Sequence, residues 1–73
     1  MNEGVMLAEA ASGRDPAQGL RAVRALRELT ERLEALQVDS ARRQGWSWQE
    51  IAAQLGVSRQ AAHKKHARRV RGI

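Results

Sequence analysis

Cysteine, tyrosine and phenylalanine are absent from this 73-residue chain, and proline occurs once. Without cysteine, neither a disulfide nor a thiolate zinc site can stabilise the fold, and nothing points to an oxidising compartment. A chain of this length has room for one small domain. Its core is marginal unless the helices pack closely or a second copy adds surface.

The chain also lacks a long apolar run preceded by basic residues. Its first segment, MNEGVMLAEAASGRDP, has an acid at Glu3 and no basic cluster. This composition is not that of a signal peptide or a membrane span. We therefore expect a soluble, cytoplasmic protein with no membrane partner.

Positive charge is concentrated at one end of the chain. Residues 1–58 contain seven Lys/Arg and eight Asp/Glu, whereas residues 59–73 contain six and none. Such asymmetry produces a local positive field suited to a polyanion such as nucleic acid. A solvated cationic tail without a partner is the alternative.

Local signals predict a flexible arm and then three helices. Residues 1–14 are expected to form the arm, with at most a weak helical turn at 5–11. Asp15 is a good helix cap and Pro16 suits the first helical position. Because Gly45 is the first breaker after Gly19, one long helix is expected over 15–44, with a kink near 38–40 left open.

An apolar seam runs along this long helix at the four-three spacing of paired helices. Its members are Ala22, Leu26, Leu29, Leu33 and Leu36. About 28 residues at about 1.5 Å each give a rod of roughly 40 Å, longer than the helices that follow. We therefore predict a homodimer through these residues. The alternative is that the stripe covers the tryptophan-containing segment of its own chain.

The remaining residues predict two shorter helices. Ser47 and Glu50 form an S-x-x-E capping box at the start of the first. Gly56 is placed to end that helix, and Ser58 to cap the next one, which is expected to run to about Arg71.

The stretch WQEIAAQLGVSRQAAHKKH carries a family resemblance. A small residue at Ala52 permits close helix approach, Gly56 supplies the turn, and Ile51, Leu55 and Val57 are expected in the core around them. This pattern resembles the helix-turn-helix of sigma factor region 4 and of small bacterial DNA-binding regulators. The resemblance covers residues 46–68 and implies a helix-turn-helix. Together with the long helix before it, the sequence predicts an all-α fold: a long N-terminal helix followed by a helix-turn-helix with no wing over residues 45–73. Ala62 and Lys65 depart from the branched apolar residues usual in the family.

Helical periodicity divides the last helix into two faces. Ala61, Ala62, His66 and Val70 are expected on the inner face. The expected DNA base contacts are Ser58, Arg59, Gln60, His63 and Lys64, because arginine pairs with guanine and glutamine with adenine in the major groove. The expected phosphate contacts are Lys65, Arg68, Arg69 and Arg71, which have no acid nearby in sequence.

Other chemistries find little support. His63 and His66 have helical i, i+3 spacing, but they lack a third ligand and Lys64 and Lys65 flank them, so no metal or other cofactor is expected. No nucleophile with a base, phosphate loop or small-molecule pocket is evident, so we predict no enzyme. The two tryptophans are expected to pack rather than to stack on bases.

These observations predict sequence-specific binding to double-stranded DNA by a dimeric, nucleoid-associated bacterial transcription regulator. One alternative is a sigma-like or antitoxin-like adaptor whose long helix binds a protein partner. Another is non-specific binding to the nucleoid, which the ratio of specific to random-duplex affinity would separate.

Overall fold

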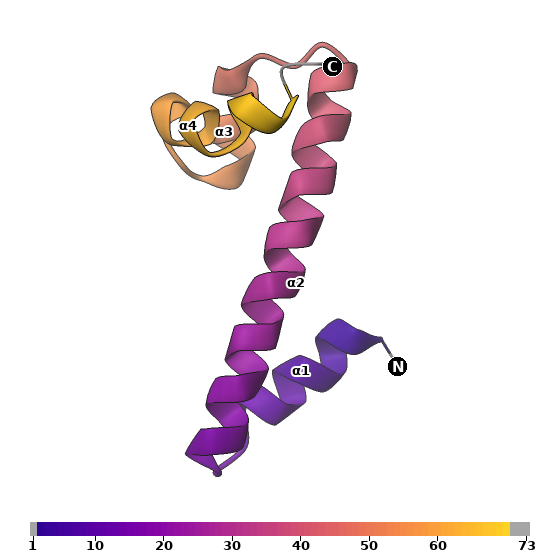
Figure 1. Cartoon of the computed structure of the whole chain (residues 1–73), viewed down its shortest axis with the longest axis vertical. Helices are drawn as coiled ribbons and strands as arrows, with labels where there is room; N and C mark the ends of the chain where they lie inside the picture. The colour runs from indigo at the N-terminus through magenta and orange to yellow at the C-terminus, as the bar shows by residue number, and fades with distance from the viewer. Residues whose placement is uncertain (1, 71–73) are drawn as a thin grey trace. The chain divides into compact units, whose positions relative to one another are not determined.

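A computed structural model describes residues 2–70 of the chain, without the side chain of Val70. In that range the protein has four helices and no strand (Figure 1): α1 (Glu3–Ala11), α2 (Pro16–Arg43), α3 (Trp48–Leu55) and α4 (Arg59–Val70). The predicted all-α class is thus confirmed for these residues. None of the described helices is long and apolar enough to cross a membrane. The described residues divide into two compact units, 2–33 and 34–70, and α2 contributes to both.

A helix at the N-terminus replaces the predicted flexible arm. The side-chain oxygen of Asn2 caps α1 by accepting a hydrogen bond from the Val5 N–H at 2.9 Å. Alanine, leucine, methionine and glutamate, all strong helix formers, make up most of the segment. Leu7 and Ala10 are half-buried, so packing supplies the stability that nine residues lack on their own.

The first unit covers part of the apolar seam of α2. Ala22 is buried at 6% exposure, and Leu26 and Leu29 are half-buried. A Cβ added at Gly4 of α1 would lie 3.8 Å from Cδ2 of Leu29, which places that leucine against α1. Some of the stripe that the sequence leaves for a partner is therefore packed within its own chain, whereas Leu33 remains 52% exposed.

The second unit contains residues 34–43 of α2 together with α3 and α4, which lie beside the carboxyl end of α2 (Figure 1). α2 runs unbroken through positions 38–40. The buried side chains of the unit are few and small apart from one imidazole: Val38, Ile51, Ala52, Ala62 and His66, each at 2–3% exposure. With so little apolar volume to bury, this unit depends on polar contacts as well.

The predicted ends of α3 and the predicted start of α4 are confirmed, whereas the expected end of the last helix at Arg71 lies outside the described residues. Ser47 Oγ accepts from the Glu50 N–H at 3.1 Å, and Glu50 Oε1 accepts from the Ser47 N–H at 2.8 Å, which completes the capping box. Gly56 closes α3 in the left-handed region at φ 73°, where any side chain would be strained. Ser58 Oγ then accepts from the Ala61 N–H at 3.0 Å and caps α4. The resulting turn is short and fixes where α4 begins.

Candidate nucleic-acid interface

The amino-terminal half of α4 presents a polar, exposed surface. Arg59, Gln60, His63 and Lys64 are all exposed, as is Ser58 just before the helix. Between Arg59 and Val70 this helix carries no acidic residue. The structure therefore brings the five predicted base contacts to the start of one helix and leaves them open to solvent.

The buried face of α4 is narrower than the sequence predicts. Ala62 and His66 are buried as expected, but Ala61 is exposed. The reason is that α4 packs along the line of positions 62 and 66, flanked by 65 and 69, whose side chains turn to α2. The fourth inner residue, Val70, has its side chain outside the described part of the chain.

Two of the predicted phosphate contacts face acids on α2. Lys65 Nζ lies 2.9 Å from Oε2 of Glu34. Arg69 donates from Nη2 and Nε to Oδ1 of Asp39 at 2.8 and 3.1 Å, and from Nη2 to the Ala35 carbonyl at 3.3 Å. These cations therefore join α4 to α2. Sequence reasoning missed the pairs because the acids lie about thirty residues upstream.

Of the other two predicted phosphate contacts, Arg68 and Arg71, only Arg68 lies within the described residues. Arg68 is exposed in the last turn of α4, and no acid is paired with it among residues 2–70. Its guanidinium is therefore available to a phosphate. Arg71 lies outside the described residues.

His66 is the centre of the polar contacts between α4 and α2. Its Nε2 lies 2.7 Å from Oε2 of Glu34, and its Nδ1 lies 2.9 Å from Nη1 of Arg69. A guanidinium only donates hydrogen bonds, so Nδ1 must accept. The ring hydrogen is then on Nε2, which donates to the carboxylate. With both nitrogens used, His66 is not available as a metal ligand. A histidine on an inner helix face needs polar partners, and that is the signal that could have revealed this cluster.

The hydrogen bond from Lys65 lowers the pKa of Glu34 below its usual range, and His66 acts in the same direction while partial burial opposes them. The carboxylate therefore stays ionised at neutral pH and can hold both donors. α4 is thus attached to α2 by charge as well as by its few apolar contacts.

A second cluster of side chains links the three helices: Arg42 of α2, Trp48 of α3 and His63 of α4. The guanidinium of Arg42 lies 5.0 Å from the ring centroid of Trp48, and its Nη1 donates to the Trp46 carbonyl at 2.6 Å. The ring of His63 meets Trp48 edge to face, with centroids 5.4 Å apart and planes at 77°. Trp48 therefore packs against other side chains, as predicted, but one of them is an expected DNA contact.

The carboxylate of Glu50 occupies the start of α3. The hydrogen bond from the Ser47 backbone N–H lowers the pKa of Glu50, so this carboxyl group is ionised and neutralises the positive end of the helix dipole. A DNA phosphate would meet a negative charge there.

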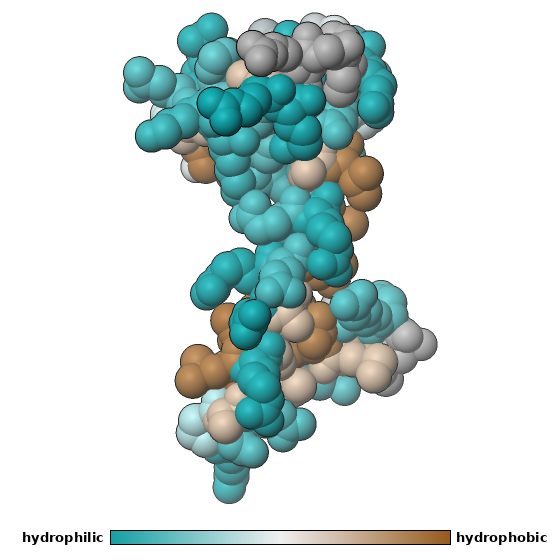
Figure 2. All heavy atoms as spheres, in the orientation of Figure 1, coloured by the Kyte–Doolittle hydropathy of each residue, from teal (hydrophilic) through white to brown (hydrophobic). Residues whose placement is uncertain are grey.

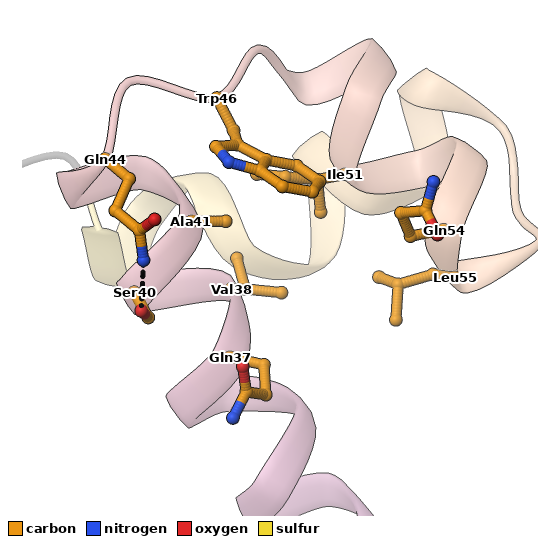
Figure 3. A pocket seen from close by; sticks show the side chains of 9 residues that line it. All are labelled: Gln37, Val38, Ser40, Ala41, Gln44, Trp46, Ile51, Gln54 and Leu55. Atoms are coloured by element: carbon orange, nitrogen blue, oxygen red, sulfur yellow. Dashed lines mark hydrogen bonds between the residues drawn. The ribbon is translucent and has the colours of Figure 1, made fainter.

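A pocket of about 200 Å³ lies between the carboxyl end of α2 and α3 (Figure 3). Its walls are Gln37, Val38, Ser40, Ala41, Gln44, Trp46, Ile51, Gln54 and Leu55. None of these carries a charge, and Gln44 Nε2 donates to Ser40 Oγ at 3.0 Å. Leu55 and Val57, both expected in the core, are 37% and 47% exposed, because an eight-residue α3 covers little of the turn. The pocket suits an apolar side chain and holds no acid or base.

Within residues 2–70, no three histidine, aspartate or glutamate side chains gather closely enough to hold a metal ion. Comparison with known protein families, curated proteins and solved structures finds no match for this chain. A function for the exposed face of α4 must therefore be argued from its own residues.

Proposed function

We propose that this protein binds double-stranded DNA in a sequence-specific manner, with α3, the turn at Gly56 and α4 acting as a helix-turn-helix without a wing. One observation carries the proposal: apart from the buried Ala62, the first half of α4 is exposed, carries Arg59 and Lys64, and has no acid. The paired side chains of Lys65 and Arg69 point to α2, so the outward cations are those on the proposed reading face.

In this arrangement the start of α4 enters the major groove. Arg59 can donate two hydrogen bonds to a guanine, and Gln60 can pair with an adenine. His63 and Lys64 lie about one turn further on, within reach of a base edge or a phosphate. Arg68 supplies a phosphate contact that adds affinity without sequence information.

In this proposal the protein acts as a homodimer through α2. Figure 2 shows hydrophobic surface along the part of the molecule that α2 spans, and two leucines of the predicted seam are more than half exposed, Leu33 (52%) and Leu36 (63%). Leu20 is also exposed (69%), but at about 100° per residue it lies on the opposite side of the helix. Exposed leucines on one side of a helix favour burial against a partner helix. A two-fold dimer would present two copies of α4 to half-sites about 34 Å apart. Together with the resemblance to sigma factor region 4 and to small bacterial regulators, this supports a role in transcription regulation at the nucleoid.

Selection from a randomised duplex library tests the proposal. The wild type is expected to enrich one motif, and Arg59→Ala and Gln60→Ala to lose the preference at one base pair each, about 1–3 kcal/mol of discrimination per contact. Arg43→Ala, an exposed arginine outside α4, is the matched control and should enrich the wild-type motif. If the wild type enriches no motif, sequence-specific binding is wrong. Binding without preference would favour the non-specific nucleoid role.

A protein-interaction module is the second candidate, and the uncharged pocket favours it. Its walls and the nearby exposed Leu36 would suit an apolar segment of another protein. Light scattering on the isolated protein discriminates the two candidates. A monomer that enriches no duplex would leave the apolar surface to a different protein partner.

A further inference from the structure

Trp48 contacts two side chains, Arg42 of α2 and His63 of α4. The Arg42 guanidinium lies over the Trp48 ring, 5.0 Å from the centroid, and donates a 2.6 Å hydrogen bond to the Trp46 carbonyl. Trp48 also contacts His63 edge to face, with ring centroids 5.4 Å apart. Trp48 is half-buried, whereas His63 is exposed. Arg42, Trp48 and His63 therefore form a chain of two contacts that ends at an exposed residue of α4.

The position of His63 at the end of these contacts determines what it can do. An exposed histidine on a helix samples several side-chain rotamers, and a contact made with DNA would require one of them. Edge-to-face packing against an indole favours a single ring orientation. Arg42 restricts the indole in turn, because its guanidinium contacts the ring of Trp48 and also donates a hydrogen bond to the Trp46 carbonyl.

We propose that Trp48 is a positioning residue for His63, holding its imidazole in the orientation in which it contacts DNA, and that Arg42 supports Trp48 in this role. This inference rests on the proposed DNA binding. Trp48, the first residue of α3, would then affect the sequence preference only through His63 of α4, and its indole would not contact DNA.

A double-mutant cycle on the enriched duplex tests the inference. Trp48→Leu is expected to weaken binding to that duplex by about threefold to tenfold, the cost of ordering one side chain on binding. His63→Ala should weaken binding by a similar factor, and the double variant should be no weaker than His63→Ala alone. Library selection should show that both single variants lose preference at the same base pair.

The matched control is Trp46→Leu, which removes the other tryptophan from the pocket wall and should leave the base preference unchanged. Thermal unfolding of every variant checks that it is folded. If Trp48→Leu does not fold, Trp48→Phe takes its place in the cycle, because it keeps a ring but shifts its edge. Its expected loss is smaller and should again vanish in the His63→Ala background.

The outcomes separate this inference from the proposed function. If the wild type enriches a motif but the Trp48 variants bind it normally, or if their loss persists undiminished in the His63→Ala background, the positioning role is wrong and DNA binding stands. If the wild type enriches no motif, the proposed function falls and the positioning role falls with it. A loss that depends on His63 and concerns one base pair supports the inference.

Discussion

The imidazole Nε2 of His66 lies 2.7 Å from the carboxylate of Glu34, thirty-two residues earlier in the chain. This hydrogen bond joins α4 to α2 at a side chain only 2% exposed. Because the core of the second unit contains few large apolar groups, the position of α4 depends on this contact and on the cations beside it.

His66→Ala should reduce the free energy of unfolding by about 2–4 kcal/mol, because it leaves a small cavity and removes two hydrogen bonds from partly buried partners. Urea denaturation measures the change. His63→Ala is the matched histidine control and should cost about 1 kcal/mol or less, the value of an exposed aromatic contact. Equal losses in the two variants would contradict a special role for His66.

Stability should fall in mild acid, and Glu34 should account for part of the decrease. The Lys65 hydrogen bond lowers the pKa of Glu34 in the folded protein, while the pKa of a glutamate in the unfolded chain is about 4.3. The stabilisation is therefore complete above the unfolded value and is lost as the pH falls through the folded one. Urea denaturation below about pH 5 should show a shallower dependence for Glu34→Gln than for the wild type. Glu28→Gln, in an exposed pair with Arg24, should behave as the wild type, and a shallower slope there would refute the assignment.

Arg68 and Arg69 are neighbours in sequence that should respond differently to alanine. Arg69→Ala breaks the contacts to Asp39 and His66 and should cost about 1–2 kcal/mol of stability, allowing for the exposure of the pair. Arg68→Ala should leave stability within about 0.5 kcal/mol. It should instead reduce the salt dependence of DNA binding by about 0.9 in log–log slope, the value of one phosphate contact. The opposite pattern would assign the phosphate contact to Arg69.

Leu36→Glu should disrupt self-association. Leu36 is 63% exposed on α2, and a charge there would be buried in a dimer that uses this surface. Sedimentation should show the dimer dissociation constant raised by about tenfold or more. Ala53→Glu adds the same charge on the exposed surface of α3 and should leave the dimer intact. A wild type that is already monomeric would exclude the dimer.

The helix ends of the second unit could be predicted because they depend on neighbours in sequence. Ser47, Glu50 and Ser58 satisfy backbone groups three residues away, and Gly56 adopts a conformation that other residues avoid. The exposed face of α4 followed from the helical period alone. Such signals need no knowledge of the rest of the fold.

The contacts that sequence reasoning missed join residues far apart in the chain. Asp39 and Arg69 are thirty residues apart, and no local pattern tells which acid a lysine or arginine on α4 will meet. α1 was missed for a related reason, since a nine-residue helix is marginal until it packs against another. The apolar seam of α2 predicted a surface that is buried against another element. It did not predict that Gly4 and its neighbours in α1 would cover part of that surface.

The hydrogen bonds around His66 run in one direction, from Arg69 through the ring to Glu34. A replacement side chain must therefore accept on the side of Arg69 and donate on the side of Glu34. Glutamine meets both requirements through the two ends of its amide, whereas lysine can only donate and leucine or methionine cannot donate at all. Position 66 is thus restricted by the direction of its two hydrogen bonds as much as by size. Relatives of this protein should carry a side chain that both donates and accepts hydrogen bonds wherever the partners at 34 and 69 are kept.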